Sequence, residues 1–151
     1  MSYIDDFGIR AVYGLGADGK GELASESAAQ NKYAIKQIVA DVSGITSTSA
    51  VQLKGAFIPK GSVIVRAYLV GTKAATTNTT TTDIGTINVD GTATGADPDG
   101  LVDGAELKAQ GHVGLGAQIN KQVAFDSAIT VLVSAAAGAA GFEGKLIVDY
   151  V

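Results

Sequence analysis

Short stretches of alternating apolar and polar residues, separated by glycine and threonine, run through most of the chain. The clearest stretch is 62–71, SVIVRAYLVG, whose even positions mix apolar and polar residues. Its odd positions are all apolar: Val63, Val65, Ala67 and Leu69. A period of two places one face of a strand on a core and leaves the other face outside. Similar alternation predicts strands over 83–90, 116–124, 128–134 and 143–151.

About seven or eight such strands, with turn signals between them, predict an all-β protein built as a two-sheet sandwich over residues 32–151. Residues 33–41 are read as a further strand, although apolar residues spaced four apart leave a helix over 25–40 as the alternative. The strand over 143–151 must be paired in a sheet to be ordered, and sandwiches place such strands in the middle of a sheet.

Residues 1–31 differ from the rest, because they are rich in Gly, Ala and Ser and are read as an extended N-terminal arm. The arm nevertheless carries many large apolar side chains, where disordered segments are usually polar. These residues are Tyr3, Ile4, Phe7, Ile9, Val12, Tyr13 and Leu15. We therefore expect the arm to become ordered on a partner.

Composition and charge argue against several classes of site and partner. The 151 residues include no cysteine, which excludes disulfides and thiolate metal sites. A net charge of −4, with Lys and Arg scattered along the chain, argues against nucleic-acid binding. No apolar run approaches the roughly 20 residues of a membrane span, and no secretory signal is recognisable at the start.

Two motifs resemble catalytic or nucleotide sites and fail on inspection. The stretch GLGADGKG, residues 14–21, has the glycine spacing of a phosphate loop, but Gly21 replaces the hydroxyl residue that binds Mg²⁺. The single histidine, His112, lies in a glycine-rich segment without a neighbouring nucleophile, and one histidine is too few for a zinc site. We expect no enzyme activity and no cofactor.

The stretch NVDGTATGADPDGLVDG, residues 88–104, carries Asp90, Asp97, Asp99 and Asp103. An EF-hand reading fails at three positions of the motif, so two turns and the start of a short helix are predicted instead. A loose calcium site stays open as an alternative. Acid–base chemistry is not expected, since nothing in so solvated a segment is predicted to raise a carboxylate pKa.

Several motifs in the last two-thirds of the chain form a recognisable series. They are IPKGSVIVRAYLVGTKA, a Thr-rich loop, TDIGTINVDGT, DPDGLVD and AITVLVSAAAGAAGFEGKLIVDYV. This series resembles the capsid decoration (cement) proteins of tailed bacteriophages over roughly residues 51–151. The positions that carry the resemblance are Ile58, Pro59, Gly61, Ile84, Gly85, Gly138, Gly141, Gly144 and Tyr150.

The resemblance implies a jelly-roll-like sandwich that binds the outside of an icosahedral shell and contacts the major capsid protein, commonly as a homotrimer. The protein would be made in the host cytoplasm and end in the virion. The expected capsid or subunit contacts are the apolar residues of the arm together with Ile64, Tyr68 and Val70. The alternative is a carbohydrate-binding sandwich of a fibre or adhesin, which the lack of tryptophan disfavours.

Overall fold

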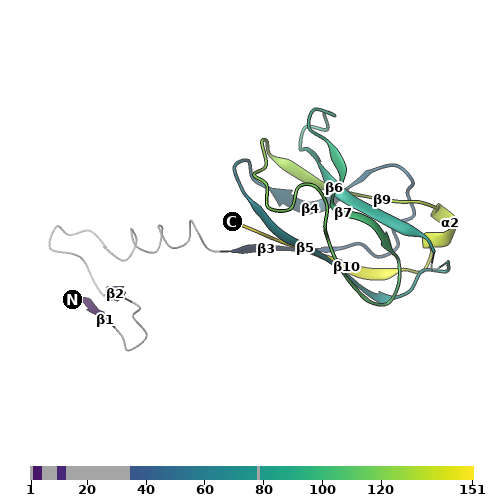
Figure 1. The fold of residues 1–151 in the computed structure, drawn as a ribbon, viewed down its shortest axis with the longest axis horizontal. Helices are drawn as coiled ribbons and strands as arrows, with labels where there is room; N and C mark the ends of the chain where they lie inside the picture. Colours follow the sequence, from purple (N-terminus) through teal and green to yellow (C-terminus); the bar gives the residue numbers. More distant parts are fainter. Residues whose placement is uncertain (1, 5–9, 13–34, 78) are drawn as a thin grey trace. The chain divides into compact units, whose positions relative to one another are not determined.

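The computed structural model describes residues 2–4, 10–12, 35–77 and 79–151. They belong to two units, Met1–Ala34 and Ile35–Val151 (Figure 1). In the first unit, strands β1 (Ser2–Ile4) and β2 (Arg10–Val12) form an antiparallel pair in which Ser2 lies opposite Val12. Of the apolar arm residues, Phe7, Ile9, Tyr13 and Leu15 lie outside the described residues.

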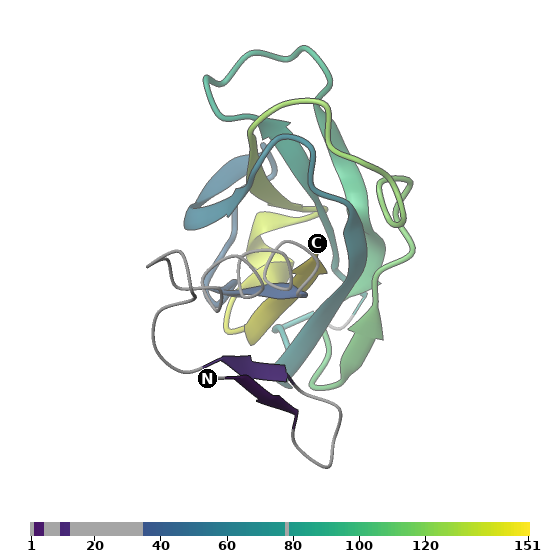
Figure 2. The ribbon, with the colours of Figure 1, turned by 90° about the vertical axis from the view of Figure 1, so that its left-hand side faces the viewer.

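The second unit is a sandwich of two antiparallel four-stranded sheets (Figures 1 and 2). The first sheet has the order β3 (Lys36–Asp41), β10 (Glu143–Tyr150), β5 (Ile64–Lys73), β8 (Gly111–Val113). The second has the order β4 (Val51–Ile58), β9 (Ser127–Val133), β6 (Thr81–Asn88), β7 (Asp97–Glu106). A single short helix among the described residues, α2 (Ala136–Ala139), joins β9 to β10. This order confirms the predicted all-β sandwich of two sheets.

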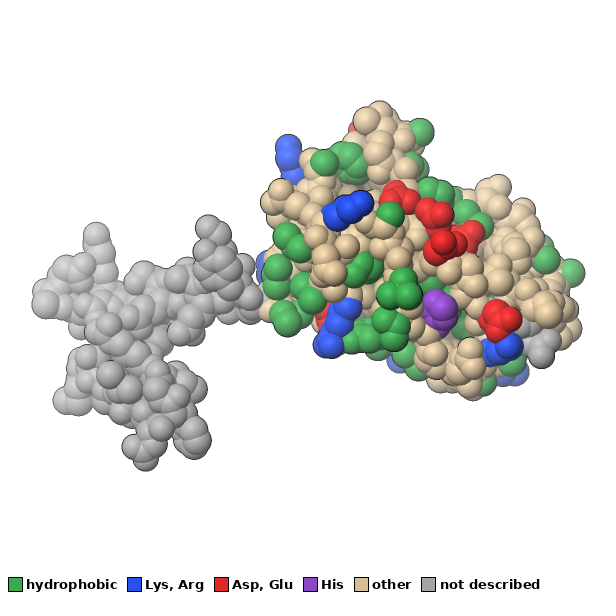
Figure 3. Space-filling model, viewed as in Figure 1, with side chains coloured by type: hydrophobic (Ala, Val, Ile, Leu, Met, Phe, Trp, Pro, Cys, Tyr) green, Lys and Arg blue, Asp and Glu red, His purple; other side chains and the backbone are tan. Residues whose placement is uncertain are grey.

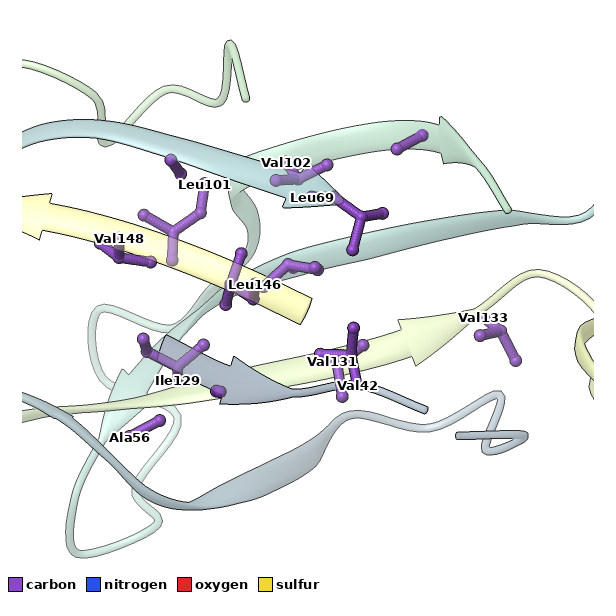
Figure 4. Packing of buried hydrophobic residues seen from close by; sticks show 14 of the residues in the cluster. Val42, Ala56, Leu69, Leu101, Val102, Ile129, Val131, Val133, Leu146 and Val148 are labelled. Atoms are coloured by element: carbon purple, nitrogen blue, oxygen red, sulfur yellow. The ribbon is translucent and has the colours of Figure 1, made fainter. Parts of the chain in front are cut away.

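The core fills the space between the two sheets. Leu146 and Val148 on β10 are fully buried, and so is Ile129 on β9 in the facing sheet. Figure 4 shows side chains from both sheets pointing into this space. Full burial of one such side chain contributes roughly 1.5–3 kcal/mol, so the alternation of the strands accounts for the cohesion of the two layers.

Five of the predicted strands are confirmed within the described residues, and two of them, over 62–71 and 83–90, correspond to β5 and β6. The segment 36–41 is a strand rather than part of a helix. Ser127–Val133 forms β9, with Ile129, Val131 and Val133 buried. The last strand, β10, pairs with β3 on one side and β5 on the other, so it lies in the middle of its sheet as expected.

The strand predicted over 116–124 is wrong. The backbone there makes turns, and Asn120 has a left-handed φ of 62°. The backbone amides of this segment do not form a regular ladder with one neighbouring strand. Gln118 N donates to the Gly100 carbonyl, and Asn120 N donates to the Ile64 carbonyl. Only an isolated bridge between Gln122 and Val63 remains of the expected pairing.

The turn and helix start predicted at Asp97–Gly100 are also wrong, because this segment begins strand β7. Strand β7 lies at the edge of its sheet, where Pro98 is tolerated although it has no amide hydrogen to donate. The close approach of β7 to β6 requires a glycine at position 85 on β6, because a Cβ there would lie 1.8 Å from the Asp97 carbonyl oxygen. The turn predicted after Asn88 is confirmed by the bond from Gly91 N to Asn88 O, 2.8 Å.

A bulge in β5 overturns one predicted contact residue. Asp149 on β10 pairs with Arg66, but the next residue, Tyr150, pairs with Ile64, so Val65 is an extra residue on β5. One extra residue reverses the alternation of side chains. Ile64 therefore joins Ala67 and Leu69 in the core and is 0% exposed, which removes it from the outer face where a partner was expected.

Candidate interaction surface

An apolar row crosses the outer face of the first sheet from one edge to the other. The strand registers place Val39, Ile147, Tyr68 and Val113 side by side on β3, β10, β5 and β8. The next positions on the central strands, Leu146 and Val148, point into the core, so this row points outward. The two ends of the row are open to solvent, with Val39 55% and Val113 57% exposed.

A polar row lies two residues along the strands from the apolar row. Arg66 Nε donates to Asp149 Oδ2 at 2.5 Å, and Gln37 Nε2 donates to Asp149 Oδ1 at 2.8 Å. The Arg66 guanidinium also lies 5.1 Å from the centroid of the Tyr68 ring, a cation–π distance. These contacts fix the positions of Arg66 and Tyr68 on the face.

The polar row also sets the charge of its central carboxylate. Burial raises the pKa of Asp149, but the hydrogen bonds from Arg66 and Gln37 outweigh it and leave the pKa below its ordinary value. The hydrogen bond to Asp149 in turn raises the pKa of Arg66. Arg66 and Asp149 therefore form an ionised pair at neutral pH, next to the apolar side chains of the neighbouring row.

The predicted contact residues divide between this face and the arm. Tyr68 is half-buried within the apolar row, and Val70, 37% exposed, lies on the same face two residues along. Tyr3, Ile4 and Val12 fall in β1 and β2, of which only the backbone is described. The contact roles of these residues stay predictions.

Sequence reasoning missed Ile147, Val113 and the role of Val39 in this surface. Each belongs to a different strand, and only the registers show that they share one row. Figure 3 shows hydrophobic side chains gathered beside the histidine on one face of the sandwich, with acidic and basic side chains around them. The sequence shows the apolar residue in each strand, but it does not show which residues of the other strands lie beside it.

A second feature is a hollow of about 260 Å³ beside the start of β7. Its walls include Asp97, Gln118, Lys121 and Phe125. Burial and the neighbouring Asp99 raise the pKa of Asp97, with Lys121 opposing, so the expectation that nothing raises a carboxylate pKa here is wrong.

Two further observations concern metal binding and the position of His112. They contain no group of three or more His, Asp or Glu side chains placed to hold a metal ion. His112 is half-buried in β8, where it lies opposite Leu69 on β5. The expectation that the protein is not an enzyme stays a prediction.

The fold and the outer face together define an antiparallel eight-stranded β-sandwich with an exposed apolar row on one sheet. Among the described residues, no helix is long and apolar enough to cross a membrane. No protein-family model and no curated protein matches the sequence.

Two solved structures contain chains of the same fold. A chain of the Cyanophage Pam1 capsid asymmetric unit is similar with a TM-score of 0.54 and 15% identity, over 77% of this chain and 83% of that one. A chain of the capsid of Ralstonia phage GP4 is similar with a TM-score of 0.56 and 17% identity, over 79% and 84%. At these identities the likeness shows a shared fold.

Proposed function

We propose that this protein is a phage capsid decoration (cement) protein, which binds the outer surface of an icosahedral capsid and stabilises contacts between capsomers. The observation that carries the proposal is the shared fold with chains in structures of two phage capsids, over more than three-quarters of this chain. Its partner is then the major capsid protein, and its place is the exterior of the virion.

The outer face of the first sheet supports a binding role. It presents an apolar row together with an ionised pair, and specific interfaces combine an apolar centre with charged groups around it. Tyr68 and Val70 on this face are the proposed contact residues outside the arm. The carbohydrate alternative gains no support, since Phe57 is the only described aromatic side chain that is exposed.

We also propose a homotrimer, because a protein placed in many copies on a symmetric shell gains from repeated interfaces around threefold positions. Light scattering of the purified protein measures the assembly. A stable dimer contradicts the trimer, whereas a monomer in dilute solution leaves assembly on the shell to be measured on capsids.

The test of the function is to mix the purified protein with capsids that lack it and to image the particles by electron microscopy. Symmetric density on the exterior at positions between capsomers is the expected result. Absence of added density at saturating protein contradicts the proposal.

A matched pair of variants locates the contact. Val70→Asp places a charge on the outer face of the first sheet, and Val89→Asp places one at a comparably exposed position just beyond β6 in the second sheet. We expect weaker capsid binding for Val70→Asp only. Equal binding by both variants contradicts the assignment of the face.

The arm has its own experiment, a chain that starts at Lys32. Capsid binding by this chain is expected to fall sharply, because burial of several apolar side chains of the arm offsets the cost of ordering it. Circular dichroism checks that the shortened chain keeps its β-sheet. Undiminished binding contradicts the proposed role of the arm.

A further inference from the structure

The sandwich has four edge strands, and three of them carry features that discourage pairing with another strand. Strand β8 has only three residues. Strand β7 contains Pro98 and several acidic residues. Strand β4 is interrupted between Gln52 and Phe57, where Gly55 has a φ of 74°. Short, proline-containing, charged or bulged edges are the usual protection against strand addition.

The fourth edge strand, β3, lacks these features apart from one charged residue at each end, Lys36 and Asp41. Its six residues contain neither proline nor glycine, and its register with β10 runs unbroken from Lys36 to Asp41. Val42 N bonds to Gly144 O, and residues alternate between bonded and free in an antiparallel ladder. Gln37 and Val39 therefore point their backbone groups away from β10, toward a side on which no other strand of the described residues pairs.

The apolar row ends at this open edge. Val39 is its last side chain and is 55% exposed, so a strand added at β3 with an apolar residue opposite Val39 would continue the row. Cross-strand apolar pairs of this kind are the unit that stabilises a sheet. The open edge thus favours a strand with apolar residues at every second position.

The chain contains one such segment outside the sandwich. From Phe7 to Leu15 every second residue is apolar, with Val12 as a further apolar residue between them, and strand β2 lies inside this segment. The apolar positions are Phe7, Ile9, Ala11, Tyr13 and Leu15, and the residues between them are Gly8, Arg10, Val12 and Gly14. In the first unit, β1 and β2 form only a three-residue pair, and an isolated two-stranded hairpin is marginally stable.

We propose that Phe7–Leu15 of a second copy of this chain adds to the free edge of β3 as a fifth strand, with its apolar positions continuing the row that ends at Val39. The inference deepens the proposed function, because a head-to-tail exchange of this kind closes into a ring such as the trimer. Residues 16–35 separate the segment from β3, and twenty extended residues span up to roughly 66–72 Å, which is enough to reach a neighbouring copy.

Engineered cysteines test this pairing in the full chain, which has no cysteine of its own. Ala11→Cys in one preparation is mixed under mild oxidation with Val39→Cys or Gln37→Cys in another, since either position faces outward at the β3 edge. Val113→Cys is the matched control, because Val113 ends the same row at the opposite edge and is equally exposed. Mass spectrometry counts the disulfides between chains.

The expected result is a several-fold greater yield of disulfides to position 39 or 37 than to position 113. Equal yields overturn the inference. A disulfide that forms only when both cysteines are in one chain also overturns it, because the segment then adds to its own sheet.

A proline pair tests the edge itself. Gly114 N bonds to Ala67 O, so Val113, like Val39, has its amide hydrogen pointing away from the sheet. Val39→Pro is therefore expected to keep the sandwich, as judged by circular dichroism, and to shift the mass measured by light scattering to that of a monomer. Val113→Pro is expected to behave as the unchanged protein.

Assembly that survives Val39→Pro overturns the inference. A monomeric unmodified protein, together with no disulfide between position 11 and position 39 or 37 in the cysteine variants, overturns it as well. Neither experiment uses capsids. The inference can therefore fail while capsid binding stands, and the proposed function can fail while the strand exchange stands.

Discussion

Arg66 and Asp149 form an ion pair between β5 and β10, with Arg66 Nε 2.5 Å from Asp149 Oδ2. The arginine side chain is half exposed, whereas the aspartate side chain is 1% exposed. The pair therefore joins a carboxylate inside the sheet surface to a guanidinium that water still reaches. A buried carboxylate depends on such partners, because its charge is otherwise unfavourable away from water.

This pair predicts a loss of stability in acid. The pKa of Asp149 in the folded protein lies below its ordinary value, and an unfolded aspartate has a pKa of about 3.9. The ionised pair thus stabilises the fold fully above that pH and loses its effect as the pH falls through the lower folded pKa. Asp149→Asn should lower the melting temperature at pH 7 and remove part of the acid dependence. An unchanged pH profile contradicts this account.

Asp97 predicts the opposite dependence. Burial and Asp99 raise its pKa in the folded protein, so its ionised form destabilises the fold as the pH rises past the unfolded value. Asp97→Asn should therefore raise the melting temperature at pH 7, and the gain should shrink near pH 3. Thermal melts at both pH values measure it. A loss of stability at pH 7 shows that the carboxylate has a role other than charge.

Gly85 and Gly111 offer a matched pair of Gly→Ala changes on strands. A Cβ at position 85 would lie 1.8 Å from the Asp97 carbonyl oxygen, while a Cβ at position 111 has open space around it. Overpacking of this kind typically costs 1–3 kcal/mol or more, so Gly85→Ala should lower the free energy of unfolding by at least about that amount. Gly111→Ala should be close to neutral in the same urea titration. Similar free energies of unfolding for the two variants contradict the close approach of β6 and β7.

Leu146 and Leu115 give a matched pair of Leu→Ala changes. Leu146 is 0% exposed in the core, and Leu115 is 86% exposed. Leu146→Ala should cost about 2–5 kcal/mol of unfolding free energy, because it leaves a cavity between the sheets. Leu115→Ala should change stability by less than about 0.5 kcal/mol. A large loss at Leu115 indicates a contact with another copy or with the arm.

The sequence predicts the architecture well because several strands carry apolar residues at every second position, as β9 does with Ile129, Val131 and Val133. It fails where one residue changes the register: Val65 is an ordinary apolar residue, yet as a bulge it moves Ile64 into the core. It also fails where a polar residue is buried, as at Thr82 and Thr86 on β6. Their hydroxyls bond to Leu132 O at 2.7 Å and Gln118 Oε1 at 2.8 Å, partners that only the folded chain supplies.

The candidate surface was predictable only in part. Tyr68 and Val70 follow from the alternation within one strand, which the sequence displays directly. The row itself depends on which strands are neighbours and on how they are aligned, and these pairings join residues far apart in the chain. Neither hydrophobic period nor turn chemistry specifies such alignment across a sheet.

The central place of β10 has a consequence for the order of folding. Gln37 and Asp149, which bond across β3 and β10, are 112 residues apart in the chain. Closing so long a loop carries an entropic cost before its contacts form, and folds dominated by such pairings fold slowly, in milliseconds to seconds. During synthesis, β3 and β5 both lack their shared neighbour until β10 has left the ribosome. The first sheet is therefore completed last, and its strands β3 and β5 are exposed to mispairing in the interval.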